Sequence, residues 1–100
     1  MKRNAKAAAL FCRISTSSYY GSISGPKEVT KTSVSMILYE KGVLGYKQVD
    51  SATASANSNT CSKSVNYSFK SGKTYKLEIT GKAYSNGSWD TLTDSVVKTF

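Results

Sequence analysis

The sequence has no histidine, one proline, two cysteines and six acidic residues, and it lacks a long apolar run. Without histidine, the Ser-His-Asp and Cys-His arrangements of hydrolases cannot form, and a zinc site loses its usual nitrogen ligand. The glycines are isolated turn residues rather than a phosphate-binding loop. We therefore expect a protein that is not an enzyme and that binds neither a metal nor a cofactor.

The start of the chain has a basic opening, but its apolar run, Ala7 to Phe11, is too short for a signal-peptide core or a membrane span. We expect no transmembrane segment. We interpret the chain as a secreted or cell-surface protein whose signal peptide has been removed. One hundred residues fit one domain, which we place at residues 7–100 behind a flexible N-terminal segment, residues 1–6.

The two cysteines, Cys12 and Cys61, stand far apart and belong to no Cys-x-x-Cys pair. They are the candidate pair for one disulfide, with two buried thiols as the alternative. A disulfide would indicate an oxidising compartment. In the simplest strand order, the strands that carry the two cysteines lie on either side of the second strand, so the cysteines are beyond disulfide reach. A disulfide therefore requires the first strand to switch sheets.

Serine and threonine make up 27 of the 100 residues, a composition that suits sheets with one wet face. Alternation of apolar and polar residues predicts short strands separated by turn residues about every ten positions. The pair Asn86 and Gly87 is the strongest local hairpin signal. The predicted strands cover Ala7–Ser15, Ser18–Ser24, Thr32–Glu40 as a central strand, Tyr46–Asp50, Cys61–Phe69, Tyr75–Ala83 and Trp89–Phe100.

Seven short antiparallel strands without helical periodicity predict an all-β, immunoglobulin-like sandwich, with a small β-barrel as the alternative. Ser51–Thr60 is predicted to be a loop or a loose edge strand, and Ser71–Lys73 a turn that joins its two flanking strands into a hairpin. Tyr75 occupies the position of the corner tyrosine of such sandwiches.

Four segments resemble a family of small secreted proteins of Gram-positive gut anaerobes that is catalogued only as a domain of unknown function. They are Val29–Lys31 leading into Val34–Lys41, then Lys70–Leu77, Ala83–Gly87 and the terminal Thr99–Phe100, within the last seventy residues. The chain departs from the family pattern at Tyr46, where a tryptophan is expected, and in its cysteine pair. The resemblance implies export and a β-sandwich, and it implies no activity.

Two groups of residues are candidates for binding. Tyr84, Asn86 and Trp89 lie together at the last predicted hairpin, where an aromatic ring beside an amide can stack on a sugar or anchor a protein. The alternative is that Trp89 caps the core of the sandwich. A second, basic aromatic face for polyanions combines three tyrosines with three lysines, Tyr19, Tyr20, Tyr39, Lys27, Lys31 and Lys41. Export argues against nucleic acid as the partner.

The net charge of +8 is spread along the chain, which favours contact with polyanions but also serves solubility. Three functional classes remain. The first is a binding or adhesion module for a cell-surface glycan or protein, and the second is a cationic antimicrobial or toxin-like effector that acts on anionic envelopes. The third is a surface protein that self-assembles through its sheet edges.

Overall fold

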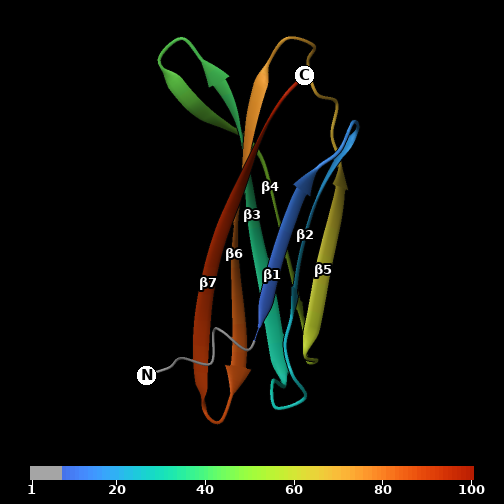
Figure 1. Cartoon of the computed structure of the whole chain (residues 1–100), viewed down its shortest axis with the longest axis vertical. Coiled ribbons are helices and arrows are strands. Elements are labelled where there is room, and N and C mark those ends of the chain that lie inside the picture. Colours follow the sequence, from blue (N-terminus) through green and yellow to red (C-terminus); the bar gives the residue numbers. More distant parts are fainter. Residues whose placement is uncertain (1–7) are drawn as a thin grey trace.

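The computed structural model describes residues 8–100, and every regular element within them is a β-strand (Figure 1). The strands are β1 (Ala9–Ile14), β2 (Ser18–Ser24), β3 (Lys31–Gly42), β4 (Gly45–Ala56), β5 (Thr60–Asn66), β6 (Thr74–Ser85) and β7 (Ser88–Thr99). The predicted flexible segment, residues 1–6, and the first residue of the predicted domain, Ala7, lie outside the described residues.

The strands form two antiparallel sheets that pack face to face. One sheet has the order β1-β2-β5 and the other the order β4-β3-β6-β7, so no strand pairing joins the sheets within residues 8–100. The predicted seven-stranded sandwich is confirmed, and the barrel alternative is not. The segment predicted as a central strand is confirmed too, because β3 lies between β4 and β6.

The core is filled by every second residue of each inner strand, as the alternating sequence predicts. The sheets come close at Gly21 and Gly81, where a Cβ atom would lie 2.5 Å from Ile79 Cδ1 and from Leu10 Cδ1 respectively. Any larger residue at either glycine would push the sheets apart. The fully buried large side chains are those of Tyr19, Ile23, Val34, Met36, Leu38, Tyr75, Leu77 and Ile79.

Of the two alternatives predicted for Ser51–Thr60, the edge strand is confirmed and the loop is not. Most of the segment belongs to the twelve-residue strand β4 at the edge of its sheet, whose alternating alanines turn a partly buried face to the core. One prediction about connectivity is wrong. The strands around Ser71–Lys73 do not form a hairpin, since β5 pairs with β2 and β6 pairs with β3. The turn at Gly72 instead carries the chain from one sheet to the other.

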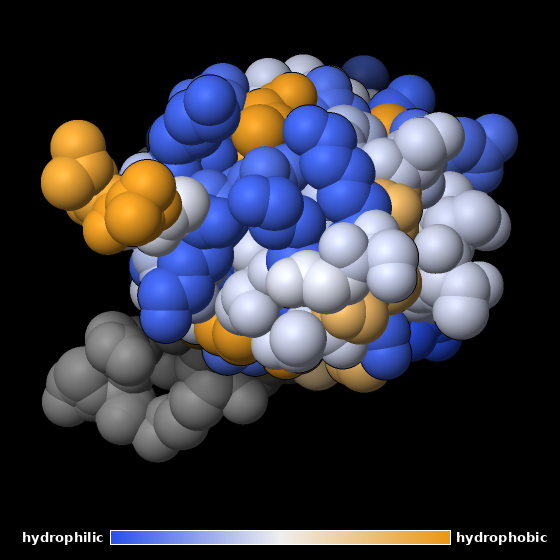
Figure 2. Space-filling view, turned by 90° about the horizontal axis from the view of Figure 1, so that it is seen from above, coloured by the Kyte–Doolittle hydropathy of each residue, from blue (hydrophilic) through white to orange (hydrophobic). Residues whose placement is uncertain are grey.

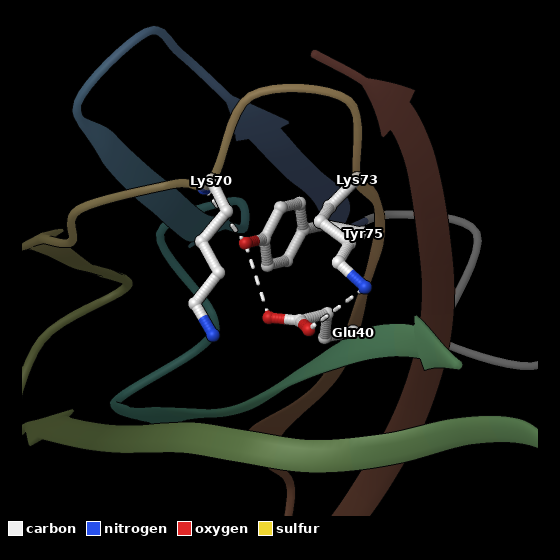
Figure 3. Close-up of polar contacts among 4 residues, drawn as sticks. All are labelled: Glu40, Lys70, Lys73 and Tyr75. Carbon is white, nitrogen blue, oxygen red and sulfur yellow. Dashed lines mark hydrogen bonds and ion pairs between the residues drawn. The ribbon is translucent and has the colours of Figure 1, made fainter. Parts of the chain in front are cut away.

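Tyr75 is the corner tyrosine that the sequence predicts, and its ring is fully buried (Figure 3). Its hydroxyl accepts a hydrogen bond from the backbone N–H of Lys70 at 2.9 Å and donates one to Glu40 Oε1 at 3.1 Å. Lys73 Nζ lies 4.0 Å from the other oxygen of Glu40. One phenol therefore ties the crossover loop between the sheets to the end of β3.

A second buried tyrosine links the two sheets. Tyr19 on β2 donates a hydrogen bond from its hydroxyl to Asp50 Oδ2 on β4 at 3.0 Å. Burial, and after it the hydrogen bond to the Asp50 carboxylate, raises the pKa of Tyr19 above its usual value. The phenol thus stays protonated as a donor at any physiological pH.

The predicted disulfide between Cys12 and Cys61 is wrong, because both cysteines are free thiols. Cys12 pairs across β1 and β2 with Gly21, while Cys61 pairs across β5 and β2 with Ile23. The first strand does not switch sheets, so the cysteines sit on opposite sides of β2 at about two strand spacings, roughly 9 to 10 Å, beyond disulfide reach. Both side chains pack against the core.

Replacing Tyr75 by phenylalanine removes both hydrogen bonds of the corner while keeping the ring. We expect the free energy of unfolding to fall by about 1.5–3 kcal/mol, because a backbone N–H and a carboxylate lose their partner. Urea unfolding followed by fluorescence measures the change. Tyr46→Phe is the matched control, since Tyr46 is 38% exposed, and an equal effect of both substitutions would contradict the role of the corner.

The thiol of Cys12 should react slowly with alkylating reagents. Burial, and then the nearby Asp94 carboxylate, raises the pKa of this thiol and so lowers its thiolate fraction at a given pH. Asp94→Asn removes the negative charge, so we expect the pKa to fall and alkylation of Cys12 to speed up at mildly alkaline pH. Mass spectrometry of timed samples measures the rate, with Asp90→Asn as the control.

The same mass spectra test the oxidation state of the two cysteines. Both cysteines should be alkylated in protein that is unfolded without reductant. Protection of both thiols under those conditions would contradict the strand order, because it would require a disulfide.

Candidate functional site

The hairpin between β6 and β7 closes with the turn that its sequence predicts. Asn86 has a φ of 51° and Gly87 a φ of 80°, the left-handed conformations that a tight two-residue hairpin turn needs. Tyr84 and Trp89 are therefore directly opposite each other on β6 and β7, and only the pair Ser85 and Ser88 lies between them and the turn. The turn sets the position of both rings.

Three side chains from adjacent strands stack in a row at this end of the four-stranded sheet. The rings of Tyr84 and Trp89 have centroids 5.1 Å apart at an interplanar angle of 56°. Lys31, opposite Tyr84 on β3, places its Nζ 5.0 Å from the Tyr84 ring centroid. Contacts of this kind are cation–π and tilted aromatic pairs, which restrict ring motion.

Trp89 remains 49% exposed despite these contacts, so its indole does not cap the core. It borders an open groove of about 310 Å³ that extends across the end of the sheet. Most of the residues that line this groove have polar side chains. The lining residues are Lys31, Thr32, Ser33, Ser55, Ala56, Asn57 and Trp89. The groove thus combines an exposed aromatic ring with several hydrogen-bonding groups.

The structure brings together only part of the predicted hairpin site. Tyr84 and Trp89 are in contact, while Asn86 lies in the turn itself and does not line the groove. The amide beside the tryptophan is that of Asn57, just after β4, with Ser55 next to it. Sequence reasoning missed both because it left their segment open between a loop and a loose edge strand and gave it no neighbour. The alternating alanines Ala52, Ala54 and Ala56 were the signal that could have revealed the strand.

The predicted basic aromatic face does not form a single surface. Tyr19 is buried, Tyr20 lies on the outer side of β2, and Tyr39 lies on β3 in the other sheet. Lys31 and Lys41 are at opposite ends of β3, and Lys27 is in the loop before it. Alternation assigned these residues to strands but could not tell which strands share a sheet.

Smaller basic aromatic contacts form instead with other partners. Arg13 on β1 lies 5.3 Å from the ring centroid of Tyr20 and 5.8 Å from that of Phe11. Lys76 on β6 lies 5.6 Å from the ring centroid of Tyr39 and 4.9 Å from that of Tyr46. Sequence reasoning missed Arg13 and Lys76, because the contacts of Arg13 with Tyr20 and of Lys76 with both rings join different strands.

Within residues 8–100, acids and cysteines do not gather in groups that could hold a metal ion. The same residues contain no helix with the length and apolar character needed to cross a bilayer.

No protein-family model matches this chain, and no curated protein matches it in sequence. The resemblance to secreted proteins of gut anaerobes therefore stays a prediction.

Among solved structures, the chicken interferon gamma receptor alpha chain is similar, with a TM-score of 0.50 and 14% identity over 93% of this chain. The chain spans about half of that receptor chain, 50% of its length. The solution structure of R. palustris CsgH gives a TM-score of 0.39 at 12% identity and covers 90% of this chain and 87% of CsgH. The likeness to the receptor chain supports an immunoglobulin-like sandwich, and at this identity it supports the fold alone.

Proposed function

We propose that this protein is an exported, non-enzymatic binding module whose groove beside Trp89 binds a cell-surface glycan. The observation that carries the proposal is the half-exposed indole of Trp89, which is held against Tyr84 at the rim of a groove lined by hydroxyl and amide groups. An exposed indole face offers a stacking surface for the apolar face of a sugar ring. The serine hydroxyls and the Asn57 amide supply donors and acceptors for sugar hydroxyls.

The geometry supports a preformed site. The left-handed turn at Asn86 and Gly87 sets the register of the hairpin, and the Lys31–Tyr84–Trp89 row limits rotation of the indole. A site that is ordered before binding avoids much of the entropy cost of ordering it during binding. The groove is open and polar, which suits an extended glycan better than a compact apolar ligand.

The structural partners of three acidic residues support a role without catalysis. Glu40 and Asp50 accept hydrogen bonds from buried tyrosines, and Glu78 pairs with Lys76 at 3.3 Å. These carboxylates have structural partners, and the chain has no histidine to act as a general base. We therefore assign the protein to the binding class rather than to an enzyme class.

Replacing Trp89 by alanine should abolish salt-resistant glycan binding. The probe is a panel of immobilised cell-surface glycans and isolated bacterial envelopes, measured at low and high salt. We expect at least about a tenfold loss of affinity, as for removal of an aromatic anchor. Because Trp89 is half-exposed, the midpoint of urea unfolding should change little.

Phe11→Ala is the matched control, because Phe11 is 48% exposed but lies on the other sheet. Asn57→Ala should weaken binding, whereas Asn86→Asp should keep it, since Asn86 lies outside the groove. Binding that vanishes with salt and survives Trp89→Ala would instead support the cationic effector class. Concentration-dependent self-association in sedimentation would support the assembling surface protein.

A further inference from the structure

The hairpin between β3 and β4 extends beyond the sandwich as an arm, which we define as residues 41–49 (Figure 1). Residues 41–48 are all exposed, and the two tip residues, Val43 and Leu44, each have a relative exposure of 103%. Figure 2 looks down on this end and shows an apolar tip that stands clear of the body beside a hydrophilic surface. Two aliphatic side chains thus lie where no other described residue covers them.

The turn itself does not require apolar residues. Gly42 and Gly45 pair across the hairpin, and Gly45, with a φ of 117°, supplies the unusual backbone conformation. The two positions between them are ones where polar turn residues are common. Single exposed apolar residues are ordinary on protein surfaces, but two adjacent ones at the end of a projection form a candidate contact surface.

The root of the arm is held firmly by the core. Glu40, just before the arm, accepts the hydrogen bond of Tyr75, and Asp50, just after it, accepts that of Tyr19. The register shifts between Leu38 and Tyr39, a bulge that bends a hairpin away from its sheet. The tip is therefore presented in a defined direction.

Aromatic and basic side chains follow the tip in a graded order along the arm. Tyr46 pairs with Lys41 roughly 7 Å behind the tip, and Tyr39 lies roughly 13 Å behind it by strand rise. Lys76 sits between these two rings, with its Nζ 4.9 Å from the Tyr46 centroid and 5.6 Å from the Tyr39 centroid. Apolar residues at the tip, with tyrosines and lysines together behind them, form an order that a bilayer surface matches.

The charge around the arm is mainly positive. The arm and the strand ends and loop beside it carry six lysines against three carboxylates, which leaves a local net charge of +3. The lysines are Lys41, Lys47, Lys70, Lys73, Lys76 and Lys98, and the carboxylates are Glu40, Asp50 and Glu78. Among the described residues, only Lys73 and Lys76 of these lysines form an ion pair.

We propose that the β3–β4 arm docks onto an anionic lipid bilayer, with Val43 and Leu44 inserted below the headgroups. Tyr46 and Tyr39 then lie at headgroup level, and Lys41 and Lys47 contact lipid phosphates. This site is independent of the proposed glycan groove, because the two lie at opposite ends of β3 in a molecule 45 Å long. Docking by the arm would leave Trp89 directed away from the membrane.

Vesicle co-sedimentation tests the apolar contact. We expect binding to phosphatidylcholine vesicles that contain phosphatidylglycerol and little binding to pure phosphatidylcholine. The double variant Val43→Ser, Leu44→Ser should bind at least about tenfold more weakly, since each buried aliphatic side chain contributes that much or more to partitioning. Phe11→Ser removes an exposed apolar residue elsewhere, and Trp89→Ala disables the glycan groove, so neither should reduce vesicle binding.

The charge contact has its own matched pair of variants. Lys41→Gln with Lys47→Gln should weaken vesicle binding by about fivefold per lysine, and the loss should shrink as salt rises. Lys27→Gln with Lys63→Gln removes equal charge away from the arm and should have a clearly smaller effect. Equal losses for both pairs would overturn the proposal in favour of a diffuse electrostatic contact.

Fluorescence reports which end is inserted. In a Trp89→Phe background, Leu44→Trp should show a blue-shifted emission on anionic vesicles, whereas Trp89 in the unmodified protein should not. A shift of Trp89, unchanged binding by the tip double variant, or no binding to either vesicle type would each overturn the assignment. A soluble oligomer that the tip double variant dissociates would do so too, because a second copy would then be the occupant.

Discussion

The structure depends on burying two tyrosine phenols in a small core. Tyr19 and Tyr75 are fully buried and supply apolar area that the chain's modest set of aliphatic residues does not provide, but each hydroxyl then needs a partner. Asp50 and Glu40 are those partners, and a backbone N–H completes the corner at Tyr75. Because the two acids flank residues 41–49, the bonds that satisfy the core also fix the root of the β3–β4 arm.

The same sheet carries both candidate binding regions, one at each end of β3. At one end the β6–β7 turn places Trp89 beside the hydroxyls and the amide of the groove. At the other end the β3–β4 hairpin splays away from its sheet with two fully exposed apolar residues at its tip (Figure 1). The elongated, thin shape, 45 by 26 by 15 Å, keeps these two regions apart, so each can meet a different surface.

No disulfide contributes to the described residues, because Cys12 and Cys61 are free. The sheets are held by side-chain packing, by the close approach at Gly21 and Gly81, and by the Tyr19–Asp50 hydrogen bond between β2 and β4. The cysteines contribute as small apolar residues of the core.

The sequence by itself determined the local features. Alternation identified seven strands, the Asn86-Gly87 pair identified the last hairpin, and the position of Tyr75 identified the corner. Only the tertiary structure decided which strands are neighbours. It placed β5 and β6 in different sheets, separated the cysteines by β2, and brought Asn57 to Trp89. The reason is physical: a period of two specifies which side of a strand is buried, whereas pairing between distant strands depends on the packing of the whole core.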